Sequence, residues 1–421
     1  MNKKLLHTPE GVRDIYNNEY KQKIKIQEKL IEVLDLYGYK GIQTPMFEFF
    51  DIFNHEKGTV SSKEMYKFFD REGNTLVLRP DMTPSIARCV AKYYDTEELP
   101  IRIGYCGNTF INNSSYQGKL KETTHIGAEL VNDDSSSGDA EIIAMAIKSF
   151  LTLGITDFTV DIGQVEFYQG IIKEFQIKGE EEERLRELIQ NKNFFGLEEF
   201  LEDADISEAG KEAILTFPEL YGGHEVLDVA KNLTYNSVAR HAVEHLESVY
   251  RILSVYGYDK YVSFDLGMLN KYNYYTGIIF KGYTYGTGDA VMKGGRYDNL
   301  LGLYGKKAPS VGFAVNVDEV LLAMTSQKIR LEDNKKKQMI VYHGAGYKPA
   351  IELATKFRDN GIVCEVMRLF QGKPIEQYLE IARKEGFEHI CYFEDKGRVW
   401  LIFTETGEYQ KLGSAEEIDI I

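Results

Sequence analysis

Apolar residues recur at helical spacing near the start of the chain. Over Asn18–Tyr37 the intervening positions are mostly lysine, glutamate and other polar residues, which predicts an amphipathic helix. Its buried stripe is expected to contain Ile24, Leu30, Ile31 and Leu34. Two glycines then end the helical pattern, because glycine is a poor helix former.

Strand-like and helical runs alternate over the next hundred or so residues. Short apolar or alternating stretches predict strands, and longer runs with apolar residues three and four apart predict helices. The predicted elements are a short strand at Ile42–Pro45, a hairpin of Met65–Asp70 and Thr75–Leu78, a helix at Thr83–Tyr94, strands at Ile101–Phe110 and His125–Val131, and an apolar helix at Ala140–Leu153.

The middle of the chain differs in composition from both of its neighbours. Residues 170–258 are charged and helix-rich, and Glu180–Glu183 opens the block with the charge pattern of a solvated helix face. Strand patterns resume at Val262–Leu266, Tyr275–Phe280 and Val311–Val315. A helical block between two strand-rich halves predicts an insertion into a sheet-based domain.

A polar, lysine-rich linker at residues 327–337 precedes a different arrangement. Strand and helix patterns alternate beyond it, at Met339–Tyr342, Pro349–Asn360, Val363–Val366, Pro374–Glu385, His389–Phe393 and Val399–Phe403. Such alternation predicts a small α/β domain in residues 338–421. The fold class is therefore expected to be α+β, with an antiparallel sheet of about six strands flanked by helices in residues 1–326.

Composition and charge narrow the class of partner. The 421 residues carry a formal net charge of −15, and an acidic surface repels phosphate backbones, so no nucleic-acid partner is expected. The four cysteines form no C-x-x-C pair, so we expect no metal site and a reducing compartment, the cytoplasm. No apolar stretch approaches the roughly 18 residues of a membrane span. No motif indicates a cofactor.

Two strings of the sequence contain polar residues whose side chains are expected to lie close together in the fold. In Leu78–Thr83 a strand turns into a helix, and Asp81 and Thr83 fall in its first turn, where they either cap the helix or bind a ligand. Strand alternation puts His125 and Glu129 on one face. His125 is either a hydrogen-bonded structural residue or part of a site. Asp81 and Glu129 together would form an anionic pocket for an ammonium group.

Two further strings are rich in tyrosine and glycine. Tyr274–Phe280 either packs aromatic rings into the core or lines a ligand site. In Gly294–Asp298, paired glycines either mark a bulge or let the backbone approach a ligand closely. Each string alone is weak, but the four together indicate one binding site.

These four strings, in this order and spacing, resemble the catalytic domain of histidyl-tRNA synthetases, which are class II synthetases. The resemblance runs from Thr8 to about Ala323, and more weakly to that family's anticodon-binding domain in the C-terminal part. It implies a class II synthetase-like fold and a histidine site, in which Asp81 replaces a glutamate and His125 a glutamine. The implied histidine-binding residues are Asp81, Thr83, His125, Glu129, Tyr274, Tyr275, Gly294, Gly295 and Arg296. Arg296 pairs either with the ligand's carboxylate or with Asp298, and the sequence leaves both open.

The same resemblance implies that this chain has lost the residues that bind ATP and promote adenylation. Family members place three arginines around ATP, and the corresponding positions here hold Ile111, Asn270 and Glu319. One well-placed arginine is worth roughly 10³–10⁵ in the rate of phosphoryl transfer, so we expect no adenylation. Lys119 and Lys121 lie nearby, but a lysine does not reproduce a bidentate clamp.

The Arg-Pro-Asp-Met-Thr and Tyr-Tyr-Thr-Gly-Ile forms of two strings instead resemble ATP phosphoribosyltransferase regulatory subunits, a family of histidyl-tRNA synthetase paralogues. This resemblance implies a non-catalytic role in the first step of histidine biosynthesis and a short catalytic subunit as partner. It also implies free histidine as a ligand and a homodimer core within a hetero-oligomer. In this synthetase class, the helix and strand ending near Pro45 pack at the twofold interface.

Two other functions remain open, an active histidine–tRNA ligase and a free-standing histidine sensor. From Gln338 to the end, 10 Lys and Arg stand against 14 Asp and Glu, a net of −4. A tRNA-binding surface should be basic, so the charge of this part favours the regulatory subunit over the ligase.

Overall fold

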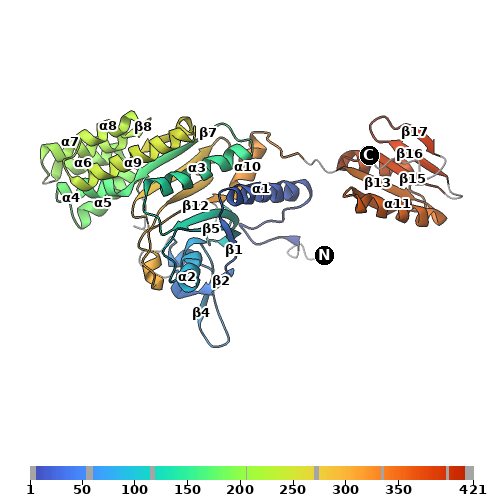
Figure 1. The fold of residues 1–421 in the computed structure, drawn as a ribbon, viewed down its shortest axis with the longest axis horizontal. Helices are drawn as coiled ribbons and strands as arrows, with labels where there is room; N and C mark the ends of the chain where they lie inside the picture. The colour runs from blue at the N-terminus through green and yellow to red at the C-terminus, as the bar shows by residue number, and fades with distance from the viewer. Residues whose placement is uncertain are drawn as a thin grey trace. The chain divides into compact units, whose positions relative to one another are not determined.

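The computed structural model describes residues 6–53, 60–113, 119–204, 206–269, 275–332, 336–394 and 398–412. The chain divides into two compact units, Met1–Leu331 and Glu332–Ile421, and each has its own sheet (Figure 1). None of the helices in this described part of the chain is both long and apolar enough to cross a membrane.

A nine-stranded sheet of described residues forms the centre of the first unit. Its middle strands pair antiparallel, whereas β1 with β5 and β7 with β9 pair in parallel. Across the sheet the order is β1 (Lys40–Ile42), β5 (Ile101–Phe110), β6 (Glu122–Val131), β12 (Ser310–Asn316), β11 (Met292–Arg296), β10 (Ile278–Thr284), β7 (Phe158–Gln164), β9 (Val262–Asp265) and β8 (Tyr221–Gly222).

The helix-flanked, largely antiparallel class predicted from the sequence is confirmed, but the expected count of about six strands is wrong. The three strands that the sequence did not predict are β7, β8 and β11. Strand β8 has only two residues and β11 contains two adjacent glycines, so neither shows a strand pattern. Three predicted strands also begin elsewhere. The strand expected at His125–Val131 is β6, which begins at Glu122. The strand expected at Ile42–Pro45 is β1, and the strand expected at Tyr275–Phe280 is β10, which begins at Ile278.

Four helices cover one face of this sheet: α1 (Asn17–Leu36), α3 (Ser136–Thr152), α9 (Ser237–Val255) and α10 (Val317–Ser326) (Figure 1). Helix α3 is buried nearly all round because α1 and α9 pack on it, which explains its almost continuous apolar sequence. In α1, Leu30 and Leu34 are buried as predicted. Ile31 is 40% exposed, however, and Ile26 and Val33 take its place in the core.

On the other face lies α2 (Thr83–Tyr93), beside a small sheet of β2 (Phe47–Phe49), β4 (Thr75–Leu78) and β3 (Lys67–Phe69). Strands β3 and β4 form the predicted hairpin. Met82 and Ile86 pack against Ile103 and Tyr105 of β5, which fixes the start of α2 beside the sheet.

The helical block contains α4 (Val165–Glu174), α5 (Glu180–Gln190), α6 (Phe194–Asp203), α7 (Glu208–Thr216) and α8 (Glu225–Asn232), followed by α9. Helix α4 packs on α9. Glu180–Glu183 occupies the first turn of α5, where acidic side chains interact favourably with the helix dipole. Leu185 and Ile189 form the buried side of α5.

The second unit has a five-stranded sheet ordered β14 (Val363–Arg368), β13 (Lys337–Tyr342), β15 (His389–Phe393), β16 (Val399–Phe403) and β17 (Tyr409–Leu412). The first three strands are parallel and the last two antiparallel. Helices α11 (Tyr347–Asp359) and α12 (Ile375–Glu385) connect them. The sequence pattern missed β17, because four mostly exposed residues carry little apolar signal.

Candidate functional site

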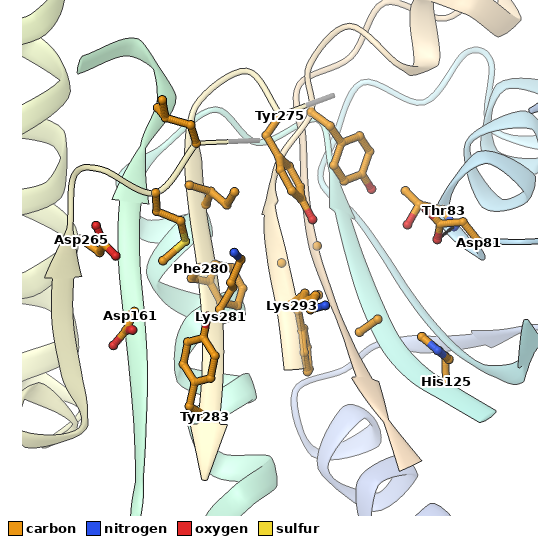
Figure 2. A pocket seen from close by; sticks show the side chains of 18 of the residues that line it. Asp81, Thr83, His125, Asp161, Asp265, Tyr275, Phe280, Lys281, Tyr283 and Lys293 are labelled. Carbon is orange, nitrogen blue, oxygen red and sulfur yellow. Dashed lines mark hydrogen bonds between the residues drawn. The ribbon is translucent and has the colours of Figure 1, made fainter. Parts of the chain in front are cut away.

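The face of the nine-stranded sheet opposite α1 and α3 carries a cavity of about 1090 Å³ (Figure 2). Along β6, Ile126, Ala128 and Leu130 point into the core, so His125 and Glu129 reach the cavity, as strand alternation predicted. The cavity brings together six residues of the expected histidine site: Asp81, Thr83, His125, Glu129, Tyr275 and Gly294.

Glu129 lies on the cavity floor and is 1% exposed. Thr83 donates its hydroxyl to Glu129 Oε1 at 3.0 Å, and the Tyr297 hydroxyl donates to Oε2. Burial raises the pKa of Glu129 to about 8, against the opposing effect of these hydrogen bonds. The carboxyl is therefore mostly protonated at neutral pH, and a cationic ligand would have to displace that proton.

Three residues that support Glu129 were not among the predicted site residues. Tyr297 and Tyr105 place their hydroxyl groups on its carboxyl. A Cβ at Gly312, on the neighbouring strand, would overlap the Glu129 carboxylate, so only glycine fits there. Tyr297 was within reach of sequence reasoning, because it belongs to the Gly294–Asp298 string from which other site residues were taken.

Asp81 combines the two roles that the sequence left open. It lies just before α2, where its carboxylate accepts the N–H of Thr83, the first residue of the helix, at 3.2 Å, and it also lines the cavity. The preceding Arg79 is buried, and it donates to the carbonyl oxygens of Asn108 at 2.7 Å and Thr44 at 2.8 Å. Arg79 thereby fixes the start of α2 against β5, and with it the position of Asp81.

His125 and Tyr275 present neutral polar groups to the same cavity. The His125 ring is within hydrogen-bond distance of the Thr123 hydroxyl, at 3.0 Å from Nε2, and desolvation lowers the His125 pKa to about 4. Burial, reinforced by the charges of Asp81 and Glu129, raises the pKa of Tyr275. At neutral pH both side chains are therefore uncharged hydrogen-bonding groups beside two acids.

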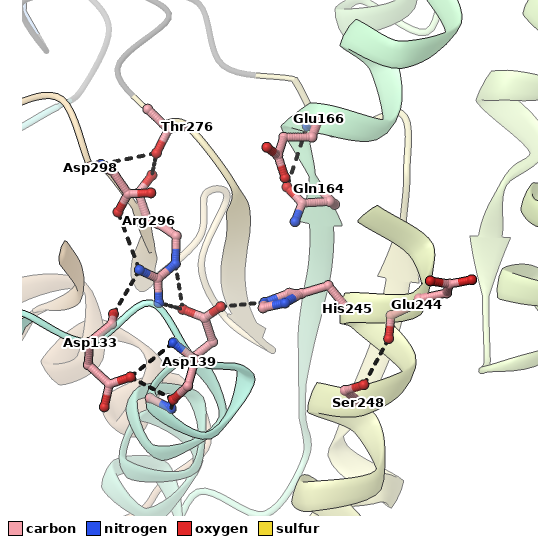
Figure 3. Close-up of polar contacts among 12 residues, drawn as sticks. Asp133, Asp139, Gln164, Glu166, Glu244, His245, Ser248, Thr276, Arg296 and Asp298 are labelled. Carbon is pink, nitrogen blue, oxygen red and sulfur yellow. Dashed lines mark hydrogen bonds and ion pairs between the residues drawn. The ribbon is translucent and has the colours of Figure 1, made fainter. Parts of the chain in front are cut away.

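Arg296 is not among the described residues that line this cavity, and it pairs with acidic side chains, which is the second of the two alternatives that the sequence left open. Its guanidinium pairs with buried Asp139 at 2.6 Å and with Asp298 at 3.3 Å, and Asp139 in turn contacts His245 at 2.6 Å (Figure 3). The carboxylates hold the arginine because an unpaired buried charge would be costly. Gly295 is likewise absent from the described residues that line the cavity, and a Cβ there would meet the ring of Tyr275.

The positions corresponding to ATP-binding arginines offer no positive charge where the structure describes them. Ile111 lines the cavity with an apolar side chain. Glu319 lies in the first turn of α10, capped by Asn316, and burial raises its pKa. Asn270 and Tyr274 fall outside the described residues.

The nearby lysines do not replace those arginines. Lys119 is 4.0 Å from Asp289, and Lys121 donates to Asn112 at 3.4 Å. Neither is among the described residues that line the cavity.

Comparison with known proteins agrees with this geometry. The family model described as histidyl-tRNA synthetase matches residues 11–320. An ATP phosphoribosyltransferase regulatory subunit from Acetivibrio thermocellus is 38% identical over 411 residues, which cover 98% of each chain. A protein of the same name from a Thermoanaerobacter species is 39% identical over 89% of this chain and 97% of its own length.

Solved structures show the same relationship. A structure titled as an ATP phosphoribosyltransferase regulatory subunit/histidyl-tRNA synthetase from Bacillus halodurans C is 30% identical and superposes with a TM-score of 0.83, covering 93% of this chain and 99% of that one. Histidyl-tRNA synthetase from a Nostoc species, at 20% identity and a TM-score of 0.80 over 96% of each chain, shares the fold.

Fold and cavity together define a class II synthetase-like protein of the histidyl-tRNA synthetase type, with a cavity lined in part by the acidic residues Asp81 and Glu129. Within that class, the chain belongs to the family of ATP phosphoribosyltransferase regulatory subunits. The resemblance drawn from the sequence strings is thus confirmed at the level of the family.

Proposed function

We propose that this chain is the non-catalytic regulatory subunit of an ATP phosphoribosyltransferase and that it binds free histidine in the cavity. The catalytic activity then lies in a partner, the short catalytic subunit, which acts in the first step of histidine biosynthesis. The observation that carries the proposal is a cavity lined by two buried or half-buried acids beside positions that lack ATP-binding charge. Asp81 and Glu129 line that site, while Ile111 stands where a synthetase would hold the α-phosphate.

The chemistry of the cavity suits histidine in particular. The α-ammonium group would sit between Asp81 and Glu129, where it replaces the proton held by Glu129. The hydroxyl of Tyr275 can then hydrogen-bond an imidazole nitrogen. His125 stays uncharged beside it, so it does not repel the ammonium group. Arg296 is engaged with Asp139, so it takes no part in holding the ligand's carboxylate.

An active histidine–tRNA ligase is disfavoured by charge. The acid at Glu319, the apolar side chain at Ile111 and the acidic composition beyond Gln338 all oppose the binding of ATP or tRNA.

A cytoplasmic location fits the biosynthetic role. The four free cysteines agree with the reducing conditions found there.

A homodimer core belongs to the same proposal. Aromatic side chains of β2 and β3 are unusually exposed for a soluble protein: Phe47 at 53%, Phe49 at 55% and Phe69 at 71%. Apolar surface of this kind marks an interface between proteins. Light scattering on Phe47→Asp should show a shift from dimer towards monomer at micromolar concentration. A wild-type chain that is already monomeric would remove this part of the proposal.

Two experiments test the central proposal. When the full chain is purified from the cells that naturally produce it, a short phosphoribosyltransferase subunit should be recovered with it in stoichiometric amount. Calorimetry with purified chain should then detect histidine binding at one site per chain. Recovery of the chain without such a partner would favour the free-standing sensor, and the absence of histidine binding would show that the site is only structural.

A further inference from the structure

A pair of lysines lies in the same cavity, on strands beyond the amino-acid site. Lys281 of β10 and Lys293 of β11 are directly opposite one another in the sheet register, and both line the cavity (Figure 2). Like charges at directly opposed positions of neighbouring strands destabilise a sheet. The arrangement is therefore costly unless an anion occupies the space between the two ammonium groups.

The carboxylates nearby do not neutralise Lys281. Among the described residues, no acidic oxygen lies within 4.0 Å of it. Asp161, its neighbour on β7, accepts the hydroxyl of Ser263 instead. Burial raises the pKa of Asp161, and burial together with Lys293 lowers the pKa of Lys281. A tight ion pair would shift each pKa in the opposite direction, so these two groups do not form one.

Lys293 has a weak partner outside the cavity. Its ammonium lies 3.4 Å from Asp289, and both side chains are 52% exposed. Exposed pairs of this kind contribute little, because water competes for both groups. The Lys293 ammonium can therefore turn to a ligand at small cost.

The shape of the cavity leaves room for such a ligand. Ala314 stands opposite Lys293 on β12, so no large side chain fills the floor between Lys293 and β6. The volume of about 1090 Å³ is above the roughly 300–1,000 Å³ typical of sites for drug-sized molecules. One amino acid at Glu129 would occupy only part of it.

We propose that Lys281 and Lys293 form an anion subsite for a phosphate-class oxyanion, either a free phosphate or pyrophosphate or the phosphate of an ester. Lysine binds phosphate as a compact point charge with several donors. A dianion matches two ammonium groups, whereas a carboxylate carries only one charge. The subsite does not depend on histidine, because its two lysines lie on β10 and β11, whereas Asp81 lies just before α2 and Glu129 lies on β6.

The test uses pyrophosphate as the probe in calorimetry on the full chain at low salt. Wild type should bind one pyrophosphate per chain. Lys281→Gln and Lys293→Gln should each weaken binding roughly tenfold or more, as expected for the loss of a charged hydrogen bond. Lys281→Arg should retain binding. Lys307→Gln is the matched control, since it makes the same charge change at an exposed site outside the cavity.

A second measurement uses the wild-type chain alone, in case a variant fails to fold. The lowered pKa of Lys281 makes it reactive towards an amine-acylating reagent near neutral pH, and bound pyrophosphate should protect it, as read by peptide mass spectrometry. Three results would overturn the subsite: no pyrophosphate binding by wild type, an equal loss in Lys307→Gln, or lysine variants that weaken histidine binding alone. If the wild-type chain binds pyrophosphate but does not bind histidine, the subsite is supported and the proposed histidine site is contradicted.

Discussion

Glu129→Gln tests the histidine site most directly, because it removes one charge and preserves the shape of the side chain. The amide oxygen can still accept the Thr83 hydroxyl. Above pH 8 the wild-type carboxyl is ionised, and the substitution should weaken histidine binding by about 1.5–3 kcal/mol, the range for a hydrogen bond to a charged group. At pH 7, ionising a carboxyl whose pKa is about 8 costs wild type about 1.4 kcal/mol, so the difference should shrink by that amount.

Calorimetry from pH 6 to 9 measures this effect. The ratio of dissociation constants, variant over wild type, cancels the titration of histidine itself and should rise with pH until Glu129 is fully ionised. In buffers of different ionisation enthalpy at pH 7, wild type should release about 0.9 proton more per histidine than the variant, given a pKa of about 8. A ratio that stays at one across the range, or equal proton release, would refute the assignment of Glu129 to the ammonium group.

The stability of the ligand-free protein provides a control for folding. The pKa of Glu129 is about 8 in the folded chain and roughly 4.3 in an unfolded one. Between these values the folded state binds more protons, so the contribution of Glu129 to stability falls as pH rises through that window and stays at its lowest above pH 8. Glu129→Gln lacks this penalty, so at pH 8 it should melt at a higher temperature than wild type.

Other predictions follow from the same geometry. The purified chain should show no histidine-dependent exchange of pyrophosphate into ATP, and any clear rate above background would revive the ligase. Asp139→Asn leaves buried Arg296 without its main partner and should lower the free energy of unfolding in urea by about 3 kcal/mol, whereas the more exposed Asp298→Asn should cost less. Gly312→Ala should abolish histidine binding by crowding Glu129, while Gly41→Ala, with open space around it, should not.

The sequence predicted elements well where a periodic pattern coincides with burial on one side. The alternation of β6 placed His125 and Glu129 on the cavity face, and the turn that leads into α2 placed Asp81 and Thr83 beside them. The sequence shows no alternating apolar pattern at the two-residue strand β8 or at the glycine-containing strand β11. These strands are held by pairing with long neighbours rather than by their own propensity, as β11 is held between β10 and β12.

The choice between the two partners of Arg296 could not be made from the sequence for a different reason. A local string shows that an arginine follows two glycines, but its partners come from distant segments. Asp139 is 157 residues away in the chain, and His245, which contacts Asp139, comes from a helix of the insertion. Tyr105 and Gly312 were missed for the same reason, since their roles depend on strands that meet only in the folded sheet. Spacing within a string carries no information about such contacts.

The balance between burial and compensating partners differs between Arg296, outside the cavity, and the ionisable groups that line the cavity. Arg296 is buried with two carboxylate partners, which raise its pKa despite the cost of burial, so the structure stabilises this charge on its own. In the cavity, burial instead opposes the charged form of Glu129, His125 and Lys281. Proteins keep such destabilised groups at sites where a ligand compensates them. A ligand that binds only the folded state stabilises it by mass action, so histidine and pyrophosphate should each raise the melting temperature, and they should do so through different residues.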